Sequence, residues 1–353
     1  MLLIAAVPAS YYYLGSHFTL STSPERGRAV LPRSLASRVA RVAYVPSALE
    51  ALWAANLGAW DAEVCATLGS SAQAATVALV LELLDSQDRD ASSAAHAALL
   101  QRAVSIGALS RLDRVFADGS MQSTFMEPLV GMLRDPRVSC PEGKRKFWGA
   151  GDTIGDDGLQ KKMWLLVSGD ARVKALVGAS PSSRALLLDI GASKWDSSSA
   201  NGVRWLTRKY KTAGVRFEHI YAWEARPMEA SAFFSGASVD DVSRLHFMNW
   251  PVSSADGNAL NPWTLLRQVA IPEDFVVVKL DIDTPAVEME LVRQLLADKQ
   301  LQALVDVFYF EHHVSIPDFS WIWKMGEYPQ TLNDSYEIFG ELRRLGVRAS
   351  PWP

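Results

Sequence analysis

The fold is indicated most clearly at residues 185–193, which read Ala185-Leu186-Leu187-Leu188-Asp189-Ile190-Gly191-Ala192-Ser193. An apolar run followed by an acid and small residues is typical of a buried strand that turns sharply into a helix. Gly191 and Ala192 would let a ligand approach the backbone, while Asp189 would orient the turn or a bound cation. A tight turn without a ligand explains these residues equally well, because the full dinucleotide-binding glycine fingerprint is missing.

Downstream of this stretch, apolar strand patterns and helical patterns alternate. We expect strands at 185–189, 218–223, 245–249, 275–280, 305–310 and 347–350, and helices at 200–212, 225–234, 263–268, 287–297 and 335–345. This alternation predicts an α/β domain with a Rossmann-like, doubly wound and mostly parallel sheet. Ligands of such sheets bind beyond the carboxyl ends of the strands, so candidate site residues are sought there.

Upstream, the chain is rich in Ala and Leu, and its pattern is helical. Ser47 and Glu50 have capping-box spacing, and further helices are expected at 72–84, 91–104, 126–133 and 159–167. The change in pattern predicts an all-helical N-terminal region over residues 1–155 and the α/β domain over residues 156–353.

Composition narrows the functional classes. The 353 residues include 35 basic and 39 acidic side chains, for a formal charge of -4, which disfavours nucleic acid as a partner. Residues 1–15 are largely apolar, but Pro8 interrupts them far short of the ~20 residues that span a bilayer. A buried arm is the simpler interpretation, and membrane association through the N-terminus stays open. Cys65 and Cys140 are two thiols or one bridge, so the compartment also stays open.

Acidic and aromatic residues follow the second and third expected strands. Glu224 comes directly after the second, where a carboxylate in nucleotide-binding sheets accepts both hydroxyls of a ribose. Asn249 and Trp250 follow the third, and the ring of Trp250 or Phe247 is suited to cover an adenine. An exposed turn glutamate and ordinary core aromatics remain the simpler alternatives.

Taken together, these segments resemble class I S-adenosylmethionine-dependent methyltransferases, and more closely the FkbM-type O-methyltransferases. The resemblance covers about residues 183–350 and includes Val278-Lys279-Leu280-Asp281-Ile282-Asp283, with Glu288 matching the acid that opens the next helix, and Phe308-Tyr309-Phe310-Glu311-His312. Two departures stand out. Residues 193–199 replace a second glycine of the family's first loop, and Thr284-Pro285 stand where the family has Gly-Ala.

The resemblance implies a methyl transfer from S-adenosylmethionine to a hydroxyl of a glycan or a small metabolite. It assigns cofactor binding to Asp189, Gly191, Ala192, Ser193, Glu224, Asn249, Trp250 and Asp281. The candidate bases, all expected at adjacent strand ends, are Asp281, Asp283, Glu311, His312 and His313. His312 is our choice of general base because its ordinary pKa is near neutral and it follows Glu311, which with Asp281 completes the predicted catalytic set. A structural role for His312 is an equal alternative.

Three other interpretations were weighed. The prediction assigns no metal, although Asp281, Asp283 and His312 offer ligand atoms for a divalent ion. A non-catalytic binding or sensing module on the same fold would explain the altered 193–199 loop. A nicotinamide-dependent reductase is disfavoured because the glycine pattern that cradles phosphates is incomplete.

Overall fold

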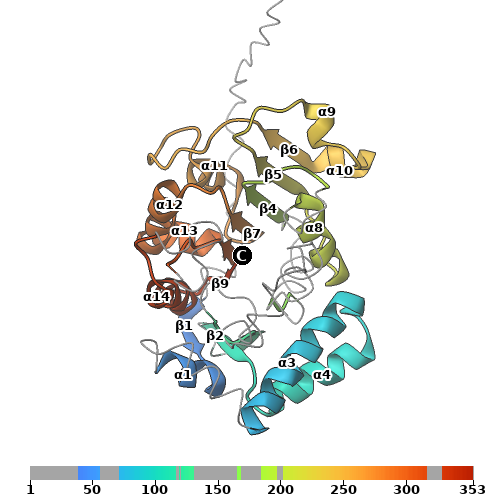
Figure 1. Ribbon diagram of the computed structural model, residues 1–353, viewed down its shortest axis with the longest axis vertical. Coiled ribbons are helices and arrows are strands. Elements are labelled where there is room, and N and C mark those ends of the chain that lie inside the picture. Colours follow the sequence, from blue (N-terminus) through green and yellow to red (C-terminus); the bar gives the residue numbers. More distant parts are fainter. Residues whose placement is uncertain are drawn as a thin grey trace, which may run out of the picture. The chain divides into compact units, whose positions relative to one another are not determined.

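The computed structural model describes residues 39–55, 71–116, 119, 121–130, 165–167, 184–196, 202–315 and 328–352 (Figure 1). Residues 34–353 group into one compact unit, so the described residues on both sides of the expected boundary at 155 belong to it. That boundary itself lies outside the described residues and stays a prediction.

The centre of the fold is a six-stranded sheet in which every neighbouring pair is parallel. The strands lie in the spatial order β6-β5-β4-β7-β8-β9. Their bounds are β4 (Ala185–Ile190), β5 (His219–Trp223), β6 (Leu245–Met248), β7 (Phe275–Leu280), β8 (Val307–Phe310) and β9 (Arg348–Pro351). The predicted α/β class is therefore confirmed, and each expected strand is present.

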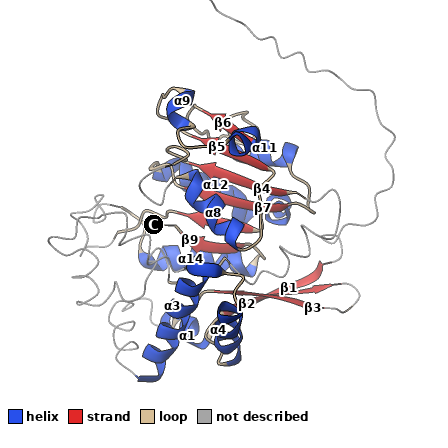
Figure 2. Cartoon of the chain, turned by 90° about the vertical axis from the view of Figure 1, so that its right-hand side faces the viewer, coloured by secondary structure: helices blue, strands red, loops and turns tan. Residues whose placement is uncertain are grey.

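Helices cover both faces of this sheet, as parallel sheets require (Figure 2). Every residue of β4 and β7 is buried, which explains why both strands read as nearly continuous apolar runs. The helices α11 (Pro262–Val269), α12 (Pro285–Ala297), α13 (Lys299–Leu304) and α14 (Leu332–Arg344) share one apolar core with one face of the sheet. On the other face, α8 (Val203–Thr212) packs into a second core.

Two short helices depart from the expected pattern. The helix expected at 225–234 is reduced to α9 (Ala230–Phe233). Glu224 and Pro227 lie in the irregular segment that precedes it. A further helix, α10 (Val239–Arg244), was missed although Ser238 and Asp241 form a complete capping box at its start.

The order of the strands reverses at β4. The chain runs from β4 outward through β5 to β6, then returns to the other side of β4 and continues through β7 and β8 to β9. Where the direction of winding reverses, the connections on the two sides diverge and leave a crevice at the carboxyl ends of the strands. The ends of β4 and β7 are consequently the place to look for a ligand.

The N-terminal region is not all-helical, so that prediction is wrong. It contains α1 (Ala48–Ala54), α3 (Ser71–Asp90) and α4 (Ala94–Ser105), but also the antiparallel sheet of β1 (Val39–Val45), β2 (Ser110–Phe116) and β3 (Met121–Met126). The central strand β2 buries Asp113 and Arg114 beside Leu112, which hides the apolar alternation that usually reveals a strand. The helix expected at 126–133 is absent from residues 126–130, and the rest of it lies outside the described residues.

Several expectations fall wholly or partly outside the described residues. These are the N-terminal arm at 1–15, Cys65 and Cys140, the 197–199 segment, and the helix at 159–167, of which only the non-helical residues 165–167 are described. Within the segments that are described, no helix has the length and apolar content needed to cross a bilayer.

Candidate functional site

The carboxyl ends of β4, β7 and β8 lie side by side. The backbone ladder continues past the strands, because Asp281 N donates to Ile190 O at 2.9 Å and Glu311 N donates to Leu280 O at 3.0 Å. Gly191, Asp281 and Glu311, each the residue that follows its strand, therefore occupy one edge of the sheet. The structure thus brings together three of the residues that the sequence singled out.

Gly191 is needed for this close approach. Its φ is +94°, and a Cβ at this position would lie 1.5 Å from the carbonyl oxygen of Asp281. The amides of Gly191 and Ala192 both donate to Trp223 O, at 3.1 and 2.8 Å. The glycine therefore allows two strand ends to touch, and both amides are already used by the neighbouring strand. Ser193 follows with a φ of 53°, in the left-handed region.

Asp189 is buried beside a lysine of the adjacent strand. Its carboxylate is 1% exposed, and its Oδ1 lies 3.3 Å from Lys279 Nζ on the adjacent strand. The same Nζ contacts Asp281 Oδ2 at 2.9 Å and donates to Gly191 O at 2.9 Å. Burial raises the pKa of Asp189 to about 6 against the lowering effect of Lys279. Asp189 therefore interacts with the residues at the carboxyl ends of the strands through Lys279, which also pairs with Asp281.

Lys279 is the central cation of the strand ends. Burial works against its charge, but the paired carboxylates of Asp189 and Asp281 outweigh this and raise its pKa. Its ammonium group also lies 5.5 Å from the centre of the Trp352 ring. A permanently charged lysine here holds the two carboxylates in fixed positions.

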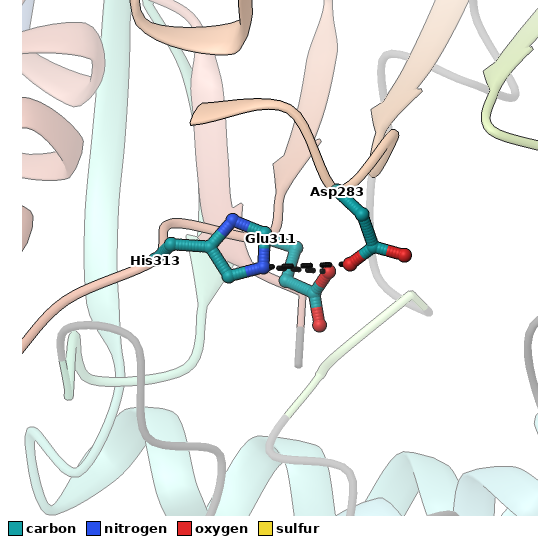
Figure 3. A group of neighbouring side chains, drawn as sticks. All are labelled: Asp283, Glu311 and His313. Carbon is teal, nitrogen blue, oxygen red and sulfur yellow. Dashed lines mark ion pairs between the residues drawn. The ribbon is translucent and has the colours of Figure 1, made fainter. Parts of the chain in front are cut away.

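A second cation, His313, lies among the remaining carboxylates (Figure 3). Its Nε2 is 3.6 Å from both Asp283 Oδ1 and Glu311 Oε2, and its Nδ1 is 3.3 Å from Glu288 Oε2. Burial alone would lower the pKa of His313, but Asp283, Glu288 and Glu311 raise it to about 10. Burial, and next the adjacent Asp281, raise the pKa of Glu311 well above its usual value. Loss of hydration on burial is the main cause of the raised pKa of Glu311, and repulsion from the neighbouring carboxylate adds to it.

His312 lies apart from this group. It is 1% exposed, its ring stacks on Phe310 with centroids 5.2 Å apart, and neither ring nitrogen has a hydrogen-bond partner among the described residues. Burial lowers the pKa of His312 to about 4. The structure therefore does not bring the predicted general base to the strand ends, where its neighbour His313 lies instead.

Asn249 supports the loop that carries Glu224. Its amide nitrogen donates to Glu224 O at 2.7 Å and to Arg226 O at 2.8 Å, and its Oδ1 accepts from Met228 N at 3.0 Å. Glu224 Oε1 accepts from Arg226 N at 2.7 Å. Among the described residues no donor contacts Glu224 Oε2, which is therefore available to a ligand. The side chain of Trp250 is an exposed aromatic at the end of β6.

Glu288 was missed as a functional candidate by the sequence interpretation, and His313 was considered as a base but passed over in favour of His312. An extended chain places alternate residues on one side, so the spacing of two from Glu311 could have indicated His313. Glu288 was noted only for its match to the family, and its place in the first turn of α12 gave no sign that its carboxylate turns back to Ile282 N, at 2.8 Å.

A separate cavity of about 640 Å³ lies beside α8 and α10. Arg216 and Arg244 from its lining pair with Asp240, and Arg204 pairs with Asp196. Three of the five basic residues that line it are thus paired with neighbouring acids. Val215–Phe217, which precede β5, place part of the cavity away from the carboxyl ends of the strands.

No family model, no curated protein and no solved structure matches this chain. A function must therefore be inferred from the residues of the chain itself.

Proposed function

We propose that the chain is an S-adenosylmethionine-dependent O-methyltransferase whose acceptor is a hydroxyl of a glycan or a small metabolite. The observation that carries the proposal is the reversal of strand order at β4, with polar residues gathered at the adjacent carboxyl ends. This is the position at which doubly wound sheets bind nucleotide-containing ligands.

The strand ends fit part of the donor. Glu224 Oε2 is available to accept the ribose hydroxyls, and the exposed ring of Trp250, in the loop after β6, can cover an adenine. Asn249 supports Glu224 from behind rather than binding the donor itself. The amides of Gly191 and Ala192 do not fit as direct contacts because Trp223 O already accepts from both, and Asp189 does not fit because its side chain is buried beside Lys279.

S-adenosylmethionine supplies an already activated methyl group when it is bound, so the protein must orient the acceptor and take up its proton. Asp281 and Glu311 are the carboxyl groups that directly follow the neighbouring strands β7 and β8. Because the pKa of Glu311 is raised well above its usual value, this group is a better proton acceptor than an ordinary surface carboxylate. In this proposal Glu311 replaces the buried His312 as the base.

A non-catalytic binding module is the second candidate. The observation in its favour is the first loop, where both amides donate to Trp223 O and Asp189 is buried beside Lys279. Such a module would keep the fold but would not bind S-adenosylmethionine.

Titration calorimetry separates these functions. The full chain is titrated with S-adenosylmethionine and, in parallel, with NAD. We expect micromolar binding of S-adenosylmethionine that weakens at least about tenfold in Glu224→Ala, since a carboxylate that holds a ribose contributes about 1.5–3 kcal/mol. Glu229→Ala, which removes an exposed glutamate without a capping hydrogen bond, is the matched control. Binding of NAD alone would support a reductase, and absence of heat with both ligands would favour the module.

A further inference from the structure

The side chains of Asp283, Glu311 and His313 present one ligand atom each to a common point, and these atoms lie within 4.8 Å of one another (Figure 3). The two contacts of His313 Nε2, at 3.6 Å, are too long for hydrogen bonds. They match the separation of two ligands that share an ion, because atoms ~2.1 Å from a metal are ~3.0–3.6 Å apart at ordinary coordination angles. The group has the spacing of a coordination site rather than of a hydrogen-bonded cluster.

A buried carboxylate behind the histidine is independent support. Glu288 is 0% exposed, and its Oε1 accepts from Ile282 N at 2.8 Å. Its Oε2 has no hydrogen-bond partner among the described residues and lies 3.3 Å from His313 Nδ1. Metal-bound histidines commonly direct their second ring nitrogen at a carboxylate, which fixes the ring and raises its basicity. Glu288 stands in that position, while the nine-tenths buried ring directs Nε2 at Asp283 and Glu311.

Charge at the strand ends also favours a cation. Five carboxyl groups share only two basic side chains in two neighbouring sets of ion pairs: Lys279 with Asp189 and Asp281, and His313 with Asp283, Glu288 and Glu311. A divalent ion would offset much of this acidic excess. Asp283 is 85% exposed, so the group is open to solvent on one side and an ion has a path to it.

We propose that Asp283, Glu311 and His313 bind a divalent metal ion, with Glu288 as the supporting carboxylate of His313. One imidazole and two carboxylates suit Mn²⁺ and Zn²⁺ better than Mg²⁺, because a nitrogen ligand favours the transition metals. The proposal concerns the binding of the ion alone and does not depend on methyl transfer. With an ion bound, Glu311 is a ligand and His313 gives up its Nε2 proton, so the base role proposed for Glu311 applies to the metal-free chain.

The test is a titration of the full chain with Mn²⁺, in which electron paramagnetic resonance measures the ion that remains free. We expect one bound ion per chain. Asp283→Asn should weaken binding at least about tenfold, and Glu311→Gln should do the same. Asn is well accepted at the φ of 52° that residue 283 adopts, so the first variant keeps the fold. The matched control is Asp256→Asn, which removes a carboxylate with an exposed side chain that contacts Arg267 outside the group.

Loss of affinity in both variants with an unchanged control supports the site. Absence of binding up to millimolar Mn²⁺ overturns it, as does binding that is equal in wild type, Asp283→Asn and Glu311→Gln. The denaturation midpoint of each variant is measured in the absence of metal to show that the chain is folded. His219 on β5 and His246 on β6 have ring nitrogens 3.1 Å apart and could also bind Zn²⁺. A parallel titration of His246→Ala with Zn²⁺ measures how much of the bound ion this pair holds. Failure of this test leaves binding of S-adenosylmethionine to be judged separately.

Discussion

Two groups of buried charged residues in this molecule differ in how completely their polar atoms are hydrogen-bonded. The first, which we call the Arg343 network, joins α14 to the N-terminal region through Arg343, Tyr44, Glu50, Glu127 and Ser350. The second is the group of acids and bases at the ends of β4, β7 and β8. Both are buried and rich in carboxylates, but the second has the larger excess of acids over bases, and more of its buried polar atoms have no hydrogen-bond partner among the described residues.

The Arg343 network is nearly saturated with hydrogen bonds. Each guanidinium nitrogen of Arg343 has an acceptor, including Ala349 O at 2.7 Å, Tyr44 Oη at 2.8 Å and Glu127 Oε1 at 3.3 Å. Glu50 Oε2 in turn accepts from Ser110 Oγ at 2.6 Å and from Leu129 N at 2.8 Å. Matching of this kind is what buried charges need if they are to hold a fold together.

The strand ends are organised differently. Asp189 Oδ2, Glu288 Oε2 and His313 Nδ1 are buried without a hydrogen-bond partner among the described residues. An unmatched polar atom costs free energy unless a ligand completes it, so such groups concentrate at functional sites. The contrast suggests that the Arg343 network is structural and that the strand ends bind something.

The largest expected effect comes from breaking the Arg343 network. Arg343→Met leaves Glu50 and Glu127 buried without their main cation, which should lower the free energy of unfolding by about 3–5 kcal/mol. Arg344→Met is the matched control, because its side chain is 59% exposed and pairs only with Glu341 among the described residues. Its expected cost is about 0–1 kcal/mol. Denaturant unfolding of both variants gives the comparison, and equal losses would remove the structural role from the network.

The next effect tests the contact between the ends of β4 and β7. Gly191→Ala should lower the free energy of unfolding by about 1–3 kcal/mol for the positive φ, and further for the overlap with Asp281 O. Gly257 also has a positive φ, +72°, but nothing lies within 4 Å of a Cβ at this position. Gly257→Ala should therefore lower the free energy of unfolding only through the positive φ. If urea titrations give the same loss for both glycines, the close approach of the strands contributes nothing.

A smaller effect distinguishes binding from stability at the strand ends. Glu288→Gln keeps an acceptor for Ile282 N but removes the charge behind His313. We expect Mn²⁺ affinity to fall about tenfold while the free energy of unfolding without metal changes by less than about 1 kcal/mol. The same resonance titration and a denaturant curve measure the two quantities. A large loss of stability with unchanged affinity would make Glu288 part of the scaffold.

The smallest expected effect concerns His96, a buried histidine outside both groups. Burial lowers its pKa, and its Nδ1 is 2.8 Å from Ser86 Oγ. The unfolded chain therefore takes up a proton more readily than the folded one, so stability from neutral His96 is complete above pH ~6.5 and is lost as the pH falls below it. His96→Gln should reduce the difference in unfolding free energy between pH ~7.5 and ~5.5. An unchanged difference would mean that His96 titrates alike in both states.

Much of the sheet was predictable because its signal is local. The apolar runs of β4 and β7 and the alternation of strands with helices need no knowledge of distant contacts. Asp281 and Glu311 were predicted for the same reason, since each directly follows a strand. The N-terminal sheet was missed because β1 and β2 are far apart in the chain and β2 buries polar residues.

The partners of the charged residues could not be predicted, because they depend on register and on distant segments. Asp189 and Lys279 are 90 residues apart and meet only because β4 and β7 pair in this register. The contact between Arg343 and Glu50 spans 293 residues. The choice of His312 over His313 failed to use the alternation of an extended chain, in which Glu311 and His313 share a side.

The most direct test of the contrast is an anomalous difference map from crystals of the full chain grown with Mn²⁺. We predict a single strong peak ~2.1–2.2 Å from Asp283 Oδ1, Glu311 Oε2 and His313 Nε2, and none at the Arg343 network. A map without a peak among these three atoms, with His313 hydrogen-bonded directly to the carboxylates, would contradict the account.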